Sequence, residues 1–218
     1  MTAADSPFRV ALTFDAEHPD RPARLGNDAR LLNALQHADV RATVFIQGRW
    51  AEAHPEVARR VATDGHLVGH HSHYHVRMIG LSAHGLQSDI ARGEEAILEA
   101  TGVDPHPWFR CPFGSGDNDP RVQRAIRWAG YRHVGWNVAG IDWESDRTAR
   151  DVENTVVDAS VAHGDGAVVL LHSWPDQSVG AVAGIVRRLR ARGATFVTVD
   201  ELPVRSVPRR DVSVGIEA

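Results

Sequence analysis

The run Ala167-Val168-Val169-Leu170-Leu171-His172 is almost continuously apolar and ends in one histidine. Continuous apolarity over so short a length is typical of a strand that is buried on both faces, as the strands of parallel sheets are. Residues 179–192 follow with apolar positions at helical spacing. The stretch therefore predicts one strand followed by one helix, which is the repeating unit of an α/β fold.

The same alternation extends outward along the chain. Strands are predicted over residues 8–14, 41–47, 66–72, 108–111, 132–138, 167–172 and 195–199. Helices are predicted over residues 27–37, 51–62, 119–129, 149–161 and 179–192, and a further long helix begins at Ser82, a good N-cap. About seven strands alternating with helices indicate an α/β fold with a parallel sheet covered by helices, and favour a barrel at least as much as an open sheet.

The composition is that of one ordinary globular domain. A chain of 218 residues is long enough for a single core, so residues 1–218 are assigned to one domain, with the barrel over 7–202 and a surface tail over 203–218. The net charge of −4 and the scattered arginines form no basic face, so nucleic acid is not an expected partner. No window approaches the roughly 20 apolar residues of a membrane span. The single cysteine and the lack of a recognisable secretory signal predict a cytoplasmic protein.

Reactive side chains directly follow several of the predicted strands. They are Asp15, His71, His75, Arg110, Asp142, Trp143 and His172. Because barrels of this type place their chemistry at the C-terminal ends of the strands, we expect these side chains on one rim.

The histidine-rich stretch Gly69-His70-His71-Ser72-His73-Tyr74-His75 suggests a metal site. His71 and His75 would share one face of a helical turn, whereas an extended chain would align both of them with His73. Imidazole suits zinc, and equally cobalt or nickel. The alternative is a solvated loop, which is less favoured because five histidines gather at this strand end.

Carboxylates and an arginine on the predicted rim suit hydrolytic chemistry. A carboxylate such as Asp15 usually joins two histidines at a hydrolytic zinc, although Asp15 would also serve as a loop cap. Arg110 can orient a carboxylate, with a surface arginine as the plainer alternative. Cys111 is interpreted as a small buried residue, because nothing nearby in the sequence forms a recognisable nucleophile set.

A histidine and two tryptophans follow the later predicted strands. His172 is a candidate general acid if Asp142 orients it, and a core histidine if nothing does. Trp143 and Trp174 lie just past strand ends, where they either stack on a sugar ring or pack in the core.

Five ordered motifs resemble those of the polysaccharide deacetylase family, the NodB-homology carbohydrate esterases. They are Thr13-Phe14-Asp15, His71-Ser72-His73-Tyr74-His75, Arg110-Cys111-Pro112-Phe113-Gly114, Asp142-Trp143 and Leu170-Leu171-His172. The resemblance covers almost the whole chain, from Val10 to about Leu202. It implies a distorted (β/α) barrel, a divalent metal, usually zinc or cobalt, and removal of acetyl groups, most often from N-acetylglucosamine units.

The resemblance also implies a role for each matched residue. Asp15 would be the base that activates a metal-held water, His71 and His75 would be metal ligands, and Arg110 would orient Asp15. His172 would protonate the leaving amine and would be held by Asp142. The substrate groove would be formed by Trp143, Trp174, Pro112, Phe113 and Leu170.

Two positions depart from the motifs of the family. Ala16 stands where the family has a second aspartate, normally the third metal ligand, and Ala139 stands where its fourth motif begins with aspartate. Glu17 lies one residue beyond Ala16 and is long enough to reach the same site. We therefore predict that Glu17, or Asp15 itself, completes the metal site, with zinc as the expected ion.

The sequence thus predicts a metal-dependent N-deacetylase that acts on an acetylated amino sugar in an oligosaccharide or small glycoconjugate. A cyclic imide or ureide hydrolase on the same scaffold would also tolerate the altered first motif. A hypothesis of another class is a carbohydrate-binding protein that lost its metal with Ala16; it would bind sugar without turnover and be indifferent to chelators.

Overall fold

The computed structural model describes residues 7–18, 24 and 26–203 of the chain. The first element begins at Phe8 and the last ends at Glu201. The tail predicted over 203–218 lies outside the described residues, apart from Pro203. Within the described part, no helix has the length and apolarity that crossing a membrane requires.

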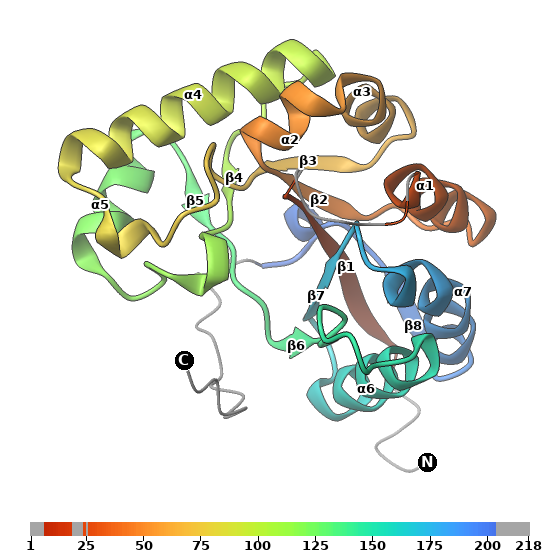
Figure 1. Cartoon of the computed structure of the whole chain (residues 1–218). Coiled ribbons are helices and arrows are strands. Elements are labelled where there is room, and N and C mark those ends of the chain that lie inside the picture. The colour runs from red at the N-terminus through yellow and green to blue at the C-terminus, as the bar shows by residue number, and fades with distance from the viewer. Residues whose placement is uncertain (1–6, 19–23, 25, 204–218) are drawn as a thin grey trace.

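Eight strands of the described residues form one parallel sheet (Figure 1). They are β1 (Phe8–Ala16), β2 (Thr43–Ile46), β3 (Leu67–His70), β4 (Trp108–Phe109), β5 (Arg132–His133), β6 (Val138–Ala139), β7 (Ala167–His172) and β8 (Ala194–Phe196). The strand order is β5-β4-β3-β2-β1-β7-β6. Strands β8 and β2 pair with the same edge of β1, β8 with its first residues and β2 with its last residues. The predicted parallel α/β barrel is confirmed, as a curled half-barrel.

Helices cover the outside of the sheet (Figure 1). They are α1 (Asn27–His37), α2 (Gly48–Ala53), α3 (Pro55–Thr63), α4 (Ala83–Thr101), α5 (Pro120–Trp128), α6 (Ala149–His163) and α7 (Asp176–Arg190), with short 3-10 turns η1 (Met78–Gly80), η2 (Pro112–Gly114) and η3 (Val199–Glu201). Ser82 is the predicted N-cap of α4, and its hydroxyl accepts a hydrogen bond from the Gly85 amide.

Several predicted elements differ from the observed ones by a few residues at their ends, and two are divided into separate elements. The helix expected over 51–62 is broken at His54, because Pro55 disfavours a helical conformation in the residue before it and then begins α3. The strand expected over 132–138 is two short strands at opposite ends of the sheet, β5 against β4 and β6 against β7. No strand pairing joins β5 to β6 within the described residues.

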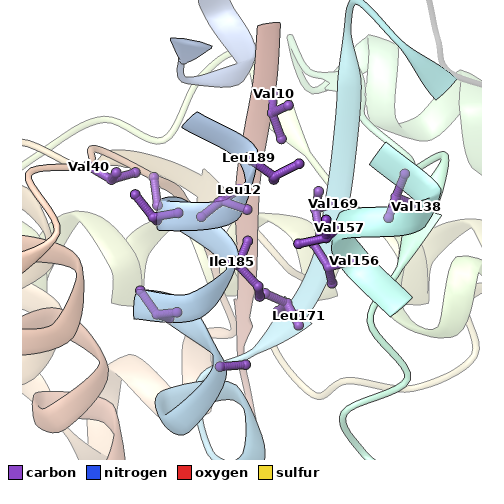
Figure 2. Packing of buried hydrophobic residues seen from close by; sticks show 14 of the residues in the cluster. Val10, Leu12, Val40, Val138, Val156, Val157, Val169, Leu171, Ile185 and Leu189 are labelled. Carbon is purple, nitrogen blue, oxygen red and sulfur yellow. The ribbon is translucent and has the colours of Figure 1, made fainter. Parts of the chain in front are cut away.

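Side chains along β1 alternate between two buried layers. Val10, Leu12 and Phe14 pack with α1, α6 and α7 in the largest apolar cluster, part of which is drawn in Figure 2. Ala11 belongs instead to the cluster inside the half-barrel, with Leu170 of β7. Odd-numbered positions of β1 therefore face the interior, and Asp15 continues that series toward the C-terminal end of the strand.

Helix α4 passes very close to the end of β3. A Cβ atom on Gly93 would lie 2.6 Å from Nε2 of His70 and 3.0 Å from the carbonyl carbon of Ser72. Gly48 of α2 makes a similar approach, because its Cβ would lie 2.9 Å from the Cα of Gly93. Glycine at these points lets both helices press on the loop that follows β3.

We expect Gly93→Ala to lower the free energy of unfolding by about 1–3 kcal/mol, because overpacking outweighs the better helix propensity of alanine. The matched control is Gly85→Ala in the same helix, where the new Cβ meets only side-chain atoms at 3.4 Å or beyond. That variant should be unchanged or more stable by up to about 1 kcal/mol. Urea denaturation measures both, and equal stabilisation of the two variants would contradict the packing described.

Candidate active site

The loop after β3 turns two imidazoles toward the mouth of the half-barrel. Ser72 and His75 have left-handed backbones, with φ of 62° and 55°, so this segment is neither the helical turn nor the extended run considered from the sequence. The Ser72 hydroxyl accepts from the His75 amide at 3.0 Å, and Asp89 of α4 accepts from the His73 amide at 3.1 Å. The resulting turn brings the rings of His71 and His75 to 5.0 Å between centroids.

The other two histidines of the loop hold it against the helices. His70 is buried, its Nε2 lies 3.0 Å from the carbonyl oxygen of Ile90 in α4, and its Nδ1 accepts from the Ser72 amide. Burial lowers the pKa of His70 to about 3, so this ring is neutral. His73 lies near α2, with Nε2 4.0 Å from Oε1 of Glu52. Neither ring lines the cavity described below.

Asp15 is held by an arginine that is completely buried. Nη1 of Arg110 donates to Oδ1 of Asp15 at 2.8 Å, while Nε and Nη2 donate to the carbonyl oxygens of Val134 and Gly135 at 3.2 and 3.1 Å. The guanidinium carbon also lies 4.1 Å from the centroid of the Phe45 ring. These contacts fix one oxygen of Asp15 and leave the other, Oδ2, 3.5 Å from Nε2 of His71.

The carboxylate of Glu17 lies among several imidazoles. Its Oε2 is in close contact with Nε2 of His75 and lies 3.3 Å from Nε2 of His71. Its Oε1 lies 3.3 Å from Nε2 of His18 and 3.8 Å from Nε2 of His172. Burial alone would raise the pKa of Glu17, but His172, His71 and His75 hold it well below its ordinary value. Glu17 is therefore an anion at neutral pH.

The environment of His71 fits a divalent cation. Its Nδ1 lies 2.9 Å from the carbonyl oxygen of Arg110 and donates to it, so Nε2 is the ring atom left for a metal. That buried Nε2 has no hydrogen-bond partner and faces Asp15 Oδ2 at 3.5 Å as well as Glu17. Burial lowers the pKa of His71, but Asp15 and Glu17 outweigh burial and raise it, so the two carboxylates favour positive charge at this point. A backbone carbonyl on the other ring nitrogen is usual for a metal-binding histidine.

Asp142 fixes the orientation and charge of His172. Oδ1 of Asp142 lies 2.8 Å from Nδ1 of His172, and Oδ2 accepts from the His172 amide at 2.7 Å and from the hydroxyl of Ser178. Burial lowers the pKa of His172, but the negative charge of Asp142 outweighs burial and raises the pKa to about 9. His172 is therefore a cation at neutral pH whose Nε2 faces Glu17.

A cavity of about 240 Å³ opens at the C-terminal ends of the strands. Its polar lining is Asp15, Glu17, His71, His75, Arg77 and His172, and its apolar lining is Phe113, Trp136, Trp143, Leu170 and Trp174. Arg110 and Asp142 lie behind this lining, each against the residue it orients. The structure thus gathers the site residues expected from the sequence, except Pro112, which is buried and lies outside the lining.

Sequence reasoning missed two residues of this cavity. Arg77 lies over the ring of Phe113, with its guanidinium carbon 5.0 Å from the centroid. Arg77 lies two residues after His75, so its nearness in sequence to the last histidine of the loop was the available signal. Trp136 falls within the stretch expected as one strand, and the break after His133 places it at the cavity instead.

The alternation along β1 places Glu17, and not position 16, on the side of the cavity. Ala16 packs in an apolar cluster with Ile46 and Trp50, on the helix side of the sheet. Glu17 lies two positions after Asp15 and lines the same cavity. With this backbone, a carboxylate at position 16 would enter the apolar layer, whereas one at position 17 faces the histidines.

Comparison with known proteins agrees with this geometry. Residues 3–134 match the polysaccharide deacetylase family. The chain belongs to that family. It is 30% identical to a peptidoglycan-N-acetylglucosamine deacetylase of Bacillus cereus, over 92% of this chain and 70% of the relative. The family membership confirms the predicted resemblance and the predicted enzyme class, hydrolases of C–N bonds other than peptide bonds.

Solved structures of the family share the fold. A family 4 carbohydrate esterase from Streptomyces lividans, in complex with acetate, superposes with a TM-score of 0.76 at 30% identity, covering 87% of this chain and 91% of that one. A mutant of a Bacillus anthracis pseudoenzyme of the same family, with restored enzymatic activity, has a TM-score of 0.80 at 25% identity and covers 94% and 70%.

In this family member we expect Arg110→Ala to lower the free energy of unfolding by about 3–5 kcal/mol, because it leaves the carboxylate of Asp15 buried without its partner. Arg132→Ala is the control, since Arg132 is an exposed arginine of β5 and should change stability by no more than about 0.5 kcal/mol. Chemical denaturation followed by fluorescence measures both. An Arg110→Ala protein as stable as the Arg132→Ala control would contradict the stabilising role assigned to the pair of Arg110 and Asp15.

His172 should titrate near pH 9 in the metal-free protein, because Asp142, Glu17 and Asp15 face it. Because the pKa is raised in the folded protein, the pair of His172 and Asp142 stabilises the fold fully below about pH 6.5, the ordinary histidine value. This contribution is lost as the pH rises through about 9. Asp142→Asn should lower the pKa of His172, whereas Asp158→Asn, at an exposed position of α6, should leave it unchanged. Imidazole NMR shifts report the titration, and a value at or below 6.5 in the unaltered protein would contradict this account.

Proposed function

We propose that this protein is a metal-dependent N-deacetylase of an acetylated amino sugar in an oligosaccharide or small glycoconjugate. The observation that carries the proposal is the placement of Asp15 and His172. Each lines the cavity, each is fixed from behind by a buried partner, and each faces the cluster formed by Glu17, His71 and His75. The arrangement supplies a proton acceptor and a proton donor beside one cation site.

Glu17, His71 and His75 would hold the metal ion, and zinc suits one carboxylate and two imidazoles. Bound there, a divalent metal would lower the pKa of water toward about 7 and polarise the acetyl carbonyl oxygen. Asp15 stays outside this ligand set in the proposal, because Arg110 already binds one of its oxygens. Its free oxygen is then available to accept a proton.

The chain's own residues account for the proton transfers. Oδ2 of Asp15 accepts a proton from the attacking water, whose oxygen forms the new bond to the acetyl carbon. As the C–N bond breaks, Nε2 of His172 gives its proton to the departing nitrogen. The products are acetate and a free amine, and Asp142 keeps Nδ1 of His172 in place throughout.

Aromatic side chains around the cavity suit a sugar ring. Trp143 and Trp174 pack around His172, with ring centroids 5.4 and 5.9 Å from its ring, and Phe113 stands beside His75 at 4.5 Å. Flat apolar faces of this kind stack on the C–H face of a pyranose while the polar groups take the acetamide. The N-acetylglucosamine named for the Bacillus cereus relative fits this chemistry. We retain the cytoplasm as the proposed location.

The proposal is tested with zinc-loaded protein and N-acetylglucosamine oligomers, measuring bound metal by elemental analysis and released acetate. We expect Glu17→Ala to lose the metal and to release acetate at least about 100-fold more slowly. Removing a residue that only supports a metal ligand typically costs about 10- to 100-fold, and removing a ligand itself should cost more. A Glu17→Ala protein that retains full zinc occupancy would exclude Glu17 as a ligand.

Position 16 supplies the matched control. We expect the double variant Glu17→Ala with Ala16→Asp to remain without metal, because the new carboxylate would lie in the apolar layer with Trp50. Recovery of metal in that variant would show that position 16 reaches the site. Zinc-loaded protein that binds the oligomers without releasing acetate would favour the carbohydrate-binding hypothesis, and turnover of cyclic imides alone would favour the other hydrolase.

A further inference from the structure

A second group of side chains of the types that bind metals lies between β4 and α5. Cys111 follows Arg110 at the end of β4, Asp117 lies in the loop that leads to α5, and His133 ends β5. One ligand atom from each of the three lies within 4.8 Å of the other two. Three separate segments of chain therefore converge on one point.

The polar side-chain atoms of Asp117 and Nε2 of His133 are buried and make no aligned hydrogen bond within the described part of the chain. The side chains of His133 and Asp117 are only 3% and 5% exposed. Nε2 of His133 lies 2.9 Å from Oδ1 of Asp117, yet neither that nitrogen nor either carboxylate oxygen makes an aligned hydrogen bond. Buried polar atoms are nearly always paired by aligned hydrogen bonds, so an imidazole and a carboxylate that meet without one, both beside a thiol, point to a cation that is shared by all three.

This group is separate from the cavity of the candidate active site. None of its three members lines that cavity. Cys111 packs in the cluster with Met78 and Val122, on the helix side of the sheet, whereas its neighbour Arg110 points to the interior. Cys111 and Arg110 therefore point to opposite faces of the sheet at the end of β4.

We propose that Cys111, Asp117 and His133 bind a second divalent metal ion, for which zinc is the best match. Thiolate, imidazole and carboxylate are the three ligand types that zinc takes in proteins, and a fourth position would be filled by water. On binding, the S–H bond of Cys111 breaks, a sulfur–metal bond forms, and the proton leaves to solvent. The inference does not depend on the deacetylase activity.

A metal at this point would fix one wall of the cavity. Residues 111–117 carry Phe113, whose backbone is left-handed with φ of 57° and whose ring stands against His75. Without a cation, burial and the charge of Asp117 raise the pKa of the Cys111 thiol well above its ordinary value, so the sulfur stays protonated. The ion would thus act as a structural clamp on the loop and would not take part in the reaction.

Cobalt substitution tests this inference with a readout that the active site cannot give. The metal-free Glu17→Ala protein, in which the first site is disabled, is titrated with Co²⁺ and its absorption is recorded. We expect one equivalent to bind with a thiolate-to-cobalt charge-transfer band in the near ultraviolet, together with release of protons. The ligands proposed for the first site include no sulfur, so this band reports on Cys111 alone.

Variants of the cluster complete the test. Cys111→Ser should abolish the band, and His133→Gln should reduce bound metal from two equivalents to one when Glu17 is intact. His66→Gln is the matched control, because His66 is another buried histidine whose Nε2 has no hydrogen-bond partner, and it should leave both equivalents in place. Absence of the band in the folded Glu17→Ala protein, with no bound equivalent, would overturn the second site. It would leave the proposed deacetylase function untouched.

Discussion

The buried guanidinium of Arg110 joins two parts of the protein that strand pairing leaves apart. Two of its nitrogens bind the carbonyl oxygens of Val134 and Gly135, where the chain passes from one end of the sheet to the other. The third holds Asp15 on the central strand. Neither charge is stable in the interior without the other, so the seam of the half-barrel and the position of the proposed base depend on a single side chain.

Much of the fold is predictable from local sequence. The apolar run at 167–172 coincides with β7, and the apolar spacing of residues 27–37 coincides with α1, because burial on both faces or on one stripe leaves a periodic pattern. The break between β5 and β6 leaves no such pattern. At the break, the carbonyl oxygen of Val134 accepts from Arg110, which lies 24 residues earlier, and a contact of that range is invisible to periodicity.

The candidate site, like the fold, is predictable from the sequence only in part. The rule that chemistry sits at the C-terminal ends of parallel strands locates Asp15, His71 and His172 on one rim, since each directly follows a strong strand pattern. The conformation of the histidine loop does not follow from its own residues. Its left-handed turns are held by Asp89 of α4, and the closeness of that helix depends on Gly93, a residue that carries no signal of its function in the sequence.

The apolar setting of Ala16 changes how inactive relatives should be recognised. In this chain position 16 faces the apolar layer, whereas position 17, two residues after Asp15, faces the cavity. A comparison that scores only the identity at position 16 does not register the carboxylate at position 17. Sorting such proteins by the face of the first strand that bears the carboxylates would separate those in which a ligand has been relocated from those in which it has been deleted.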